Sequence, residues 1–223
     1  MTHTDVNQAD VNQADVKQAD AKQADANETA AKTSGRRALI VVDVQRDFCE
    51  GGSLAVAGGR AVASRISELL AGQHGYSRVV ATRDHHIDPG GHFSDNPDFV
   101  DSWPRHCVVG TPGAEFTEEL TFDDFDAIFD KGEYTAAYSG FEGAEGDGTG
   151  LRQWLAGAGV TAVEICGIAT DHCVRATALD AVKAGLDTTV LVDLTAAVNP
   201  SSISETLDEL AAAGVSFRGR LPG

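Results

Sequence analysis

The sequence lacks the features of several protein classes. Lysine and arginine number only 17 against 34 aspartates and glutamates, which gives the 223-residue chain a formal net charge of -17 at pH 7. So acidic a surface repels the phosphates of nucleic acids and anionic membranes, and we expect neither as a partner. No apolar run approaches the roughly 18 residues of a membrane-spanning helix, and the N-terminus lacks the basic and apolar blocks of a secretory signal. We therefore predict a cytoplasmic protein.

Cysteines are also few, and their spacing shows no pairs. They are Cys49, Cys107, Cys166 and Cys173, and no two of them form a C-x-x-C motif. Neither a disulfide framework nor a thiolate zinc site is therefore indicated. A chain of this length suits one domain with a sizeable core, so a small disulfide-stapled scaffold is not expected. Cys49, in a loop, and Cys166, within an apolar strand, are interpreted as structural.

The first 35 residues differ from the rest in composition. Residues 5–29 form a five-residue repeat, DVNQA, DVNQA, DVKQA, DAKQA, DANET, and residues 1–35 contain no Leu, Ile, Phe, Tyr or Trp. A five-residue step turns each repeated residue by about 140° around a helix, so the valines cannot line one face and a coiled coil is excluded. We predict a disordered tail over residues 1–35, because this composition does not offset its ordering entropy. A partner-binding or transiently helical segment is the alternative.

From residue 36 onward, short β-branched apolar runs alternate with stretches of helical spacing. The runs predict strands over residues 36–44, 77–82, 126–131, 160–168, 188–194 and 215–218, and the stretches predict helices over 59–71, 151–157, 171–184 and 201–213. Such alternation implies parallel pairing. We predict one domain over residues 36–223 with an α/β fold, a doubly wound three-layer sandwich whose central, mostly parallel sheet has about six strands. Ligand sites in such sheets lie at the carboxyl ends of the strands.

Three side chains suited to nucleophilic catalysis lie at or just past the carboxyl ends of predicted strands. Asp43 closes the run ALIVVD, Lys131 closes AIFDK, and Cys173 lies in the first turn of the helix after the fourth strand, which Thr170 or Asp171 is expected to cap. At that position the helix dipole is expected to lower the pKa of the thiol. Taken alone, each residue has an ordinary alternative: a solvated or capping carboxylate, a surface lysine and an inert buried thiol.

Histidines are concentrated beside an aspartate. His85, His86, His92 and His106 fall within 22 residues, next to Asp84. In an extended segment the side chains of Asp84 and His86 lie on the same side, while His85 points the other way. One carboxylate and three imidazoles suit zinc, iron(II) or manganese. We predict one divalent metal ion, with zinc favoured, held by Asp84, His86, His92 and His106; exposed loop histidines are the alternative.

Together these features resemble the nicotinamidases (pyrazinamidases) of the isochorismatase-like cysteine hydrolase superfamily. The matching strings, between about residues 37 and 214, are ALIVVDVQRDFCEGGSLAV, RDHHIDPGGHFS, SWPRHCVVGTPGAEF, KGEYTAAYSGFEG and GIATDHCVRATALDAV. The resemblance implies that Asp43, Lys131 and Cys173 are catalytic, and it implies the same four metal ligands. Arg83 and His85 depart from the family pattern without affecting an assigned role.

The resemblance also implies the remainder of the site. An oxyanion hole would use the backbone N–H groups of Ala169 and Cys173, following a cis peptide bond between Ile168 and Ala169. The residues that match aromatic positions around the substrate ring are Phe48, Trp103 and Tyr138.

The activity implied is hydrolysis of nicotinamide to nicotinate and ammonia through a cysteine thioester, with the metal ion on the pyridine nitrogen. This reaction serves NAD salvage, and family members also hydrolyse analogues such as pyrazinamide. The expected partner is therefore a small-molecule substrate, and the sequence leaves open whether the chain is a monomer or a homo-oligomer. The alternatives are another small-amide or carbamoyl amidohydrolase of the superfamily, a metal-dependent isochorismatase and a non-catalytic metal-binding protein.

Overall fold

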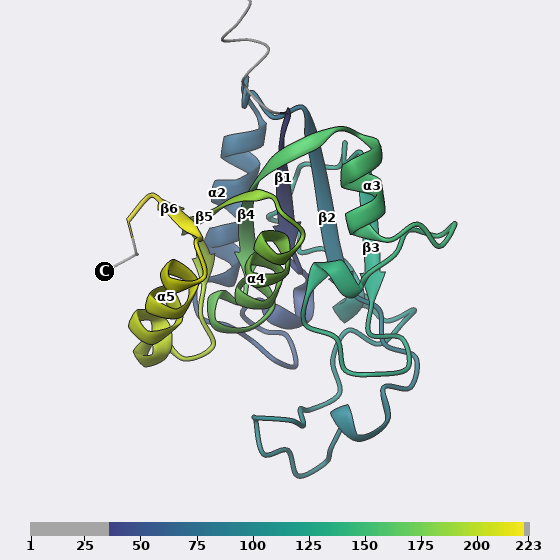
Figure 1. Ribbon diagram of the computed structural model, residues 1–223. Helices are drawn as coiled ribbons and strands as arrows, with labels where there is room; N and C mark the ends of the chain where they lie inside the picture. The colour runs from purple at the N-terminus through teal and green to yellow at the C-terminus, as the bar shows by residue number, and fades with distance from the viewer. Residues whose placement is uncertain (1–35, 221–223) are drawn as a thin grey trace, which may run out of the picture. The chain divides into compact units, whose positions relative to one another are not determined.

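The fold is built on one parallel sheet. A computed structural model describes residues 36–220, so the predicted disordered tail, residues 1–35, lies outside the described residues. Within residues 36–220, six strands form a sheet in the order β3-β2-β1-β4-β5-β6, and each neighbouring pair is parallel (Figure 1). The sheet predicted as mostly parallel is thus wholly parallel in this part of the chain.

The strands and helices follow the predicted alternation. The strands are β1 (Arg36–Val42), β2 (Arg78–Asp84), β3 (Ala127–Lys131), β4 (Val160–Ile168), β5 (Asp187–Ala196) and β6 (Ser216–Arg218). The helices are α2 (Gly59–Leu70), α3 (Leu151–Gly157), α4 (Arg175–Lys183) and α5 (Ile203–Ala212). Among the residues that the structure describes, none of the helices is long and apolar enough to cross a membrane.

Helices cover both faces of the sheet and complete the three predicted layers. Along β1, Leu39 and Val41 belong to an apolar cluster that includes residues of α2, whereas Ala38, Ile40 and Val42 belong to a second cluster with residues of α3, α4 and α5. Figure 1 shows α2 on one side of the sheet and α4 on the other. Successive side chains of a strand point to opposite faces, so a strand covered on both sides is apolar at every position.

The direction in which strands are added reverses at β1. The chain places β2 and β3 on one side of β1, and then β4, β5 and β6 on the other. At such a switch point the connections that leave neighbouring strands diverge and open a crevice at the carboxyl ends. All of the predicted site residues lie at or beyond the carboxyl ends of β1, β2, β3 and β4, so the topology brings them to one edge of the sheet.

The close pairing of β1 with β4 requires a glycine at position 167. Gly167 has a φ of +116°, and a Cβ atom built there would overlap the carbonyl oxygen of Val42 on β1. Gly167→Ala is therefore expected to lower the free energy of unfolding by at least about 3 kcal/mol, measured by chemical denaturation.

Gly185→Ala provides the matched control for this loss. Gly185 also has a positive φ, +83°, but apart from the glycine itself and its two chain neighbours no described residue has an atom within 4 Å of the position that a Cβ atom would occupy there. We expect a loss of only about 1–2 kcal/mol from the strained backbone alone. Equal losses in the two variants would contradict a close approach of β4 to β1 at Gly167.

Candidate active site

Three reactive side chains meet beyond the ends of three different strands. Asp43 follows β1, Lys131 is the last residue of β3, and Cys173 lies in a π-helical turn, η5 (Thr170–Val174), after β4. Lys131 Nζ lies 2.9 Å from Asp43 Oδ2 and 3.9 Å from Cys173 Sγ. The exposed fractions of Asp43, Lys131 and Cys173 are 0%, 1% and 7%. The structure thus brings together the three residues that the sequence suggested as catalytic, in a setting where water screens their charges little.

The backbone of Asp43 turns sharply at the end of β1. Its φ is +50°, a left-handed conformation that aspartate adopts more readily than most residues. Its N–H donates a hydrogen bond to Thr82 O (3.1 Å), and Thr82 Oγ1 donates one to Asp43 Oδ1 (2.6 Å). These two bonds fix the carboxylate from β2 and leave its other oxygen beside Lys131.

Lys131 is buried between two carboxylates. Its ammonium group forms ion pairs with Asp43 and Asp84 and donates a hydrogen bond to Ala137 O (3.2 Å). Burial lowers the pKa of Lys131, but the two carboxylates outweigh burial and hold that pKa well above its usual value. Burial raises the pKa of Asp84, but the charge of Lys131, together with the nearby imidazoles of His106 and His86, brings it well below its usual value. Lys131 therefore stays cationic and Asp84 anionic.

The thiol of Cys173 departs from the expectation for a helix N-terminus. Burial raises the pKa of Cys173 well above its usual value, and the charge of Lys131 only partly opposes this effect. Burial likewise raises the pKa of Asp43. The predicted lowering of the thiol pKa is therefore wrong, because desolvation in this closed turn outweighs the helix dipole. The thiol rests protonated and needs a neighbouring base to become a nucleophile.

The predicted cap of the turn is also wrong. Ala169 occupies the N-cap position of η5, and neither Thr170 nor Asp171 caps it, since no described side chain does. The Asp171 carboxylate instead accepts hydrogen bonds from the N–H groups of Val198 (2.9 Å) and Asn199 (2.8 Å). Asp171 thereby ties the turn that carries Cys173 to the segment after β5.

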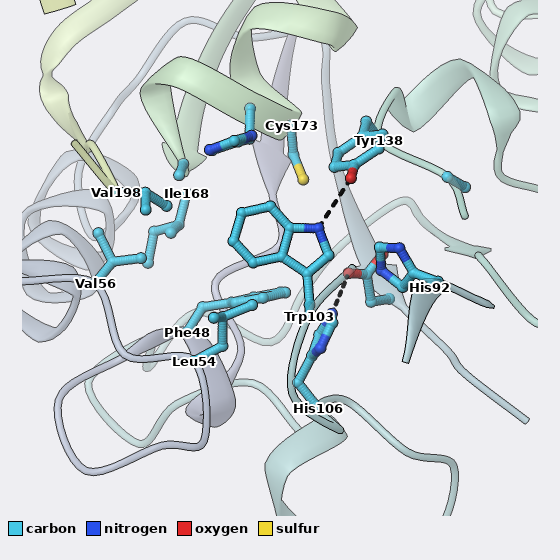
Figure 2. A pocket seen from close by; sticks show the side chains of 14 residues that line it. Phe48, Leu54, Val56, His92, Trp103, His106, Tyr138, Ile168, Cys173 and Val198 are labelled. Carbon is cyan, nitrogen blue, oxygen red and sulfur yellow. Dashed lines mark hydrogen bonds and ion pairs between the residues drawn. The ribbon is translucent and has the colours of Figure 1, made fainter. Parts of the chain in front are cut away.

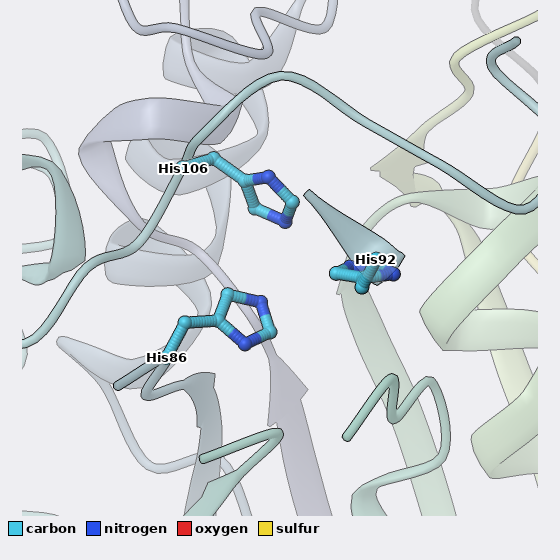
Figure 3. Close-up of side chains that lie close together, drawn as sticks. All are labelled: His86, His92 and His106. Atoms are coloured by element: carbon cyan, nitrogen blue, oxygen red, sulfur yellow. The ribbon is translucent and has the colours of Figure 1, made fainter. Parts of the chain in front are cut away.

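Three buried histidines lie close together next to Asp84. The nitrogen atoms of His86, His92 and His106 that could bind a metal ion all lie within 4.8 Å of one another, and Figure 3 shows the rings converging. Asp84 Oδ2 lies 3.5 Å from His86 Nε2 and 3.7 Å from His106 Nε2. The four residues that the sequence suggested as metal ligands are therefore neighbours. His85 Nδ1 lies near Asp130 and Glu133, outside this group, as expected.

The hydrogen bonds of the histidines leave nitrogen atoms free for a metal ion. His86 Nδ1 lies 2.6 Å from Gly132 O, and His106 Nδ1 lies 2.7 Å from Pro104 O. His86 Nε2 and His92 Nδ1 are buried without a hydrogen-bond partner among the described residues. Burial, with the neighbouring histidines, lowers the pKa of His92 to about 4, so its ring is neutral near pH 7. Three convergent imidazoles, two of which have their Nδ1 atoms against backbone carbonyls, together with a carboxylate fit a divalent ion such as zinc.

One pocket joins the thiol to the histidine group (Figure 2). The residues that line it are Phe48, Leu54, Val56, Asp84, His92, Trp103, His106, Ala137, Tyr138, Ile168, Ala169, His172, Cys173 and Val198. Trp103 Nε1 donates a hydrogen bond to Tyr138 OH (3.0 Å), which joins the loops after β2 and β3. The pocket therefore contains the three expected aromatic residues, and its walls include the thiol together with Asp84, His92 and His106; His86 is not among the described residues that line it. Apolar walls with a few convergent polar groups are typical of small-molecule sites.

The peptide bond before η5 and His172 within it are two further features of the site. The Ile168–Ala169 peptide bond is cis, as the resemblance implied. His172 lines the pocket, although no sequence motif indicated a role for it. Its ring lies 5.3 Å from that of Trp103 and is stacked at 6.3 Å on that of Tyr138. Its position directly before Cys173 was the one available signal. Leu54, Val56 and Val198 come from distant loops and carried no such signal.

Comparisons with known proteins give consistent matches. The family described as "Isochorismatase domain" matches residues 37–218. The nicotinamidase/pyrazinamidase of Mycobacterium tuberculosis is 59% identical over 181 residues, covering 81% of this chain and 97% of that protein. The structure of the pyrazinamidase of Pyrococcus horikoshii in complex with zinc has a TM-score of 0.72 at 39% identity, covering 83% of this chain and 99% of that one. A protein of L. infantum in complex with nicotinate has a TM-score of 0.73 at 36% identity, covering 83% and 93%.

Proposed function

The chain belongs to the isochorismatase domain family and is an amidohydrolase that acts on a carboxamide, and from this premise we propose that it hydrolyses nicotinamide to nicotinate and ammonia. The resemblance expected from the sequence is thereby confirmed. The observation that carries the proposal is a pocket lined both by Cys173, whose sulfur lies 3.9 Å from the buried Lys131 that pairs with Asp43, and by Asp84, His92 and His106 of the histidine group. In the cell, nicotinate formed in this way would serve NAD salvage.

The first half of the proposed reaction forms a thioester. Asp43 takes the proton of the Cys173 thiol as the sulfur attacks the carboxamide carbon of the substrate. The carbon–nitrogen bond then breaks, and Asp43 returns the proton to the departing nitrogen, which leaves as ammonia. Lys131 stabilises the carboxylate and the forming thiolate by its charge, because its ammonium group lies near both.

The second half hydrolyses the thioester. Asp43 takes a proton from a water molecule, whose oxygen attacks the same carbon. The carbon–sulfur bond breaks, the sulfur regains a proton from Asp43, and the acid product leaves as nicotinate after its carboxyl proton passes to solvent. In both halves a negative oxygen develops on the carbon under attack. We assign the N–H groups of Ala169 and Cys173 to this oxygen, a contribution of roughly 3 kcal/mol for each donor.

The group formed by Asp84, His86, His92 and His106 would hold a divalent metal ion, with zinc favoured over iron or manganese. When bound, the ion supplies a Lewis acid for the ring nitrogen of the substrate and so orients the ring. Phe48, Trp103 and Tyr138 provide apolar surface for the ring. Pyrazinamide has a ring nitrogen at the corresponding place, so we expect it to be a second substrate.

Benzamide tests this assignment because it carries the same carboxamide but no ring nitrogen. We expect kcat/KM for ammonia release to be at least about 100-fold lower with benzamide than with nicotinamide, since a ring that is not oriented misplaces the reacting carbon. Removal of the metal ion with a chelator should abolish most of this preference, and added zinc should restore it. Equal turnover of both amides by the zinc-loaded enzyme would contradict the role of the metal site.

The second candidate function is hydrolysis of another small amide or a carbamoyl compound. The same Asp43, Lys131 and Cys173 would serve it, but the histidine group would then have no part in substrate binding. Ammonia release from a different amide, with nicotinamide left intact by the zinc-loaded protein, would favour that function.

A further inference from the structure

Gln45 is a fully buried polar residue that the proposed reaction does not use. Its exposed fraction is 0%. Its side-chain Nε2 donates hydrogen bonds to Asp84 O (2.8 Å) and Ala114 O (2.9 Å), and its Oε1 accepts one from the N–H of Asp84 (2.8 Å). Both donor hydrogens and the oxygen of the amide are therefore engaged. Two of the three bonds go to the backbone of a single residue, Asp84.

These bonds occur where the pairing of β1 with β2 stops. The last pair in the register is Val42 with Thr82, and the turn at Asp43 then carries the chain away from β2. In a parallel pair, alternate residues of a strand direct their N–H and C=O groups to the same side, so Asp84 presents both groups toward the side that β1 has left. The Gln45 amide offers an oxygen and an N–H as a peptide group would. The Gln45 side chain thus takes the place of a residue of β1 in the hydrogen bonding to β2.

These hydrogen bonds hold Asp84, which contacts both the proposed metal site and the buried lysine, Lys131. On its other side, Asp84 is paired in register with Lys131 of β3. Its carboxylate forms an ion pair with Lys131 and lies within 4 Å of the Nε2 atoms of His86 and His106. Asp84 is the final residue of β2, and the chain beyond it leaves the sheet. Without Gln45, the N–H and C=O groups of Asp84 would lose these partners, and the nearest backbone hydrogen bond to β3 would be the one that the N–H of His85 donates to Lys131 O (2.8 Å).

We propose that Gln45 is a positioning residue for Asp84, and that it raises the affinity of the site for its metal ion by fixing the backbone from which the carboxylate projects. This inference rests on the proposed function, since it assigns Asp84 to the metal ion. Loss of partners that orient a metal ligand typically weakens metal binding by about 10–100-fold. A residue needed only to satisfy buried backbone groups would lower stability and leave metal affinity unchanged.

Two substitutions separate these roles. Gln45→Met keeps the length of the side chain and removes all three hydrogen bonds. Gln45→Asn keeps an amide but shortens the side chain by one methylene group, so it cannot reach Asp84 and Ala114 together. We expect both variants to melt at lower temperature than the wild type, because buried N–H and C=O groups lose their partners.

Ser67→Ala is the matched control. Ser67 is also buried and forms side-chain hydrogen bonds to backbone groups: its Oγ donates to Glu119 O (2.9 Å) and accepts from the N–H of Thr121 (2.9 Å). It lies on α2 and is not among the described residues that line the pocket. The control should lose stability in the same manner as the Gln45 variants without any change at Asp84.

The experiment measures zinc affinity of the full-length chain by competition with a chromogenic chelator, beside the melting temperature of the metal-free protein. We expect the zinc dissociation constant to rise about 10–100-fold in both Gln45 variants and to stay near the wild-type value in Ser67→Ala. Folded Gln45 variants with wild-type zinc affinity would overturn the inference, as would failure of both variants to fold. A wild-type chain that neither binds zinc nor releases ammonia from nicotinamide would overturn the proposed function instead.

Discussion

Cys173→Ala is expected to lower kcat for ammonia release from nicotinamide by at least about 10⁴-fold. Removal of a nucleophile forces direct attack by water, and only substrate positioning and oxyanion stabilisation remain to help it. The substitution removes a sulfur atom that lies 3.9 Å from Lys131 Nζ. Because no metal ligand changes, zinc stoichiometry should equal that of the wild type. A coupled ammonia assay at saturating nicotinamide measures the loss.

Cys166→Ala is the control for this result. Cys166 is a fully buried thiol on β4 that does not line the pocket, and burial raises its pKa, so it too rests protonated. The variant should lose some stability through the small cavity left behind and keep kcat within about threefold of the wild type. Retention of more than a tenth of wild-type kcat by Cys173→Ala would rule out Cys173 as the nucleophile.

Asp43→Asn is expected to lower kcat by at least about 10³-fold. The carboxylate is assigned every proton transfer in both halves of the reaction, and a positioned acid–base group typically contributes about 10²–10⁴-fold. Asparagine suits the test because it tolerates the φ of +50° at this position and can still accept the hydrogen bond from Thr82. The measurements are kcat with nicotinamide and the zinc content of the purified protein.

The zinc content distinguishes the roles of the two buried aspartates. Asp43 lies beside Lys131, whereas Asp84 also lies near the histidines. Asp43→Asn should therefore keep its zinc, while Asp84→Asn should lose most of it. Loss of zinc from Asp43→Asn, or wild-type turnover by that variant, would show that the assignment of these residues is wrong.

Much of the fold could be predicted from the sequence because strands buried on both faces have a distinct pattern. The run from Ala38 to Val42 is apolar throughout, and its residues divide alternately between two helix-covered clusters. The positions of residues at the strand ends also predicted that Asp43 and Lys131 lie near the thiol of Cys173. Since Asp43, Lys131 and Cys173 each lie at or just past the carboxyl end of a parallel strand, we expected them to meet at one edge of the sheet. Asp84 and His86 could be placed on one side because residues two apart in a strand share a face.

The remainder of the site depends on contacts that no local pattern encodes. The raised pKa of Cys173 comes from burial by segments far apart in the chain, so its position before a helix predicted the wrong direction. Thr170 or Asp171 was expected to cap that helix, but neither does, and the carboxylate of Asp171 accepts hydrogen bonds from the backbone of Val198 and Asn199. Gln45 gave no signal either, since its partner Asp84 is 39 residues away. Hydrogen bonds between residues so far apart in the chain can be identified only from the folded structure.

The most direct test of the proposed function measures nicotinate and ammonia formed from nicotinamide by the zinc-loaded, full-length chain. We expect one molecule of each product for every nicotinamide consumed, over many turnovers, and no product above background with Cys173→Ala at the same concentration. A wild-type chain that is folded, binds zinc and leaves nicotinamide intact would contradict the proposal.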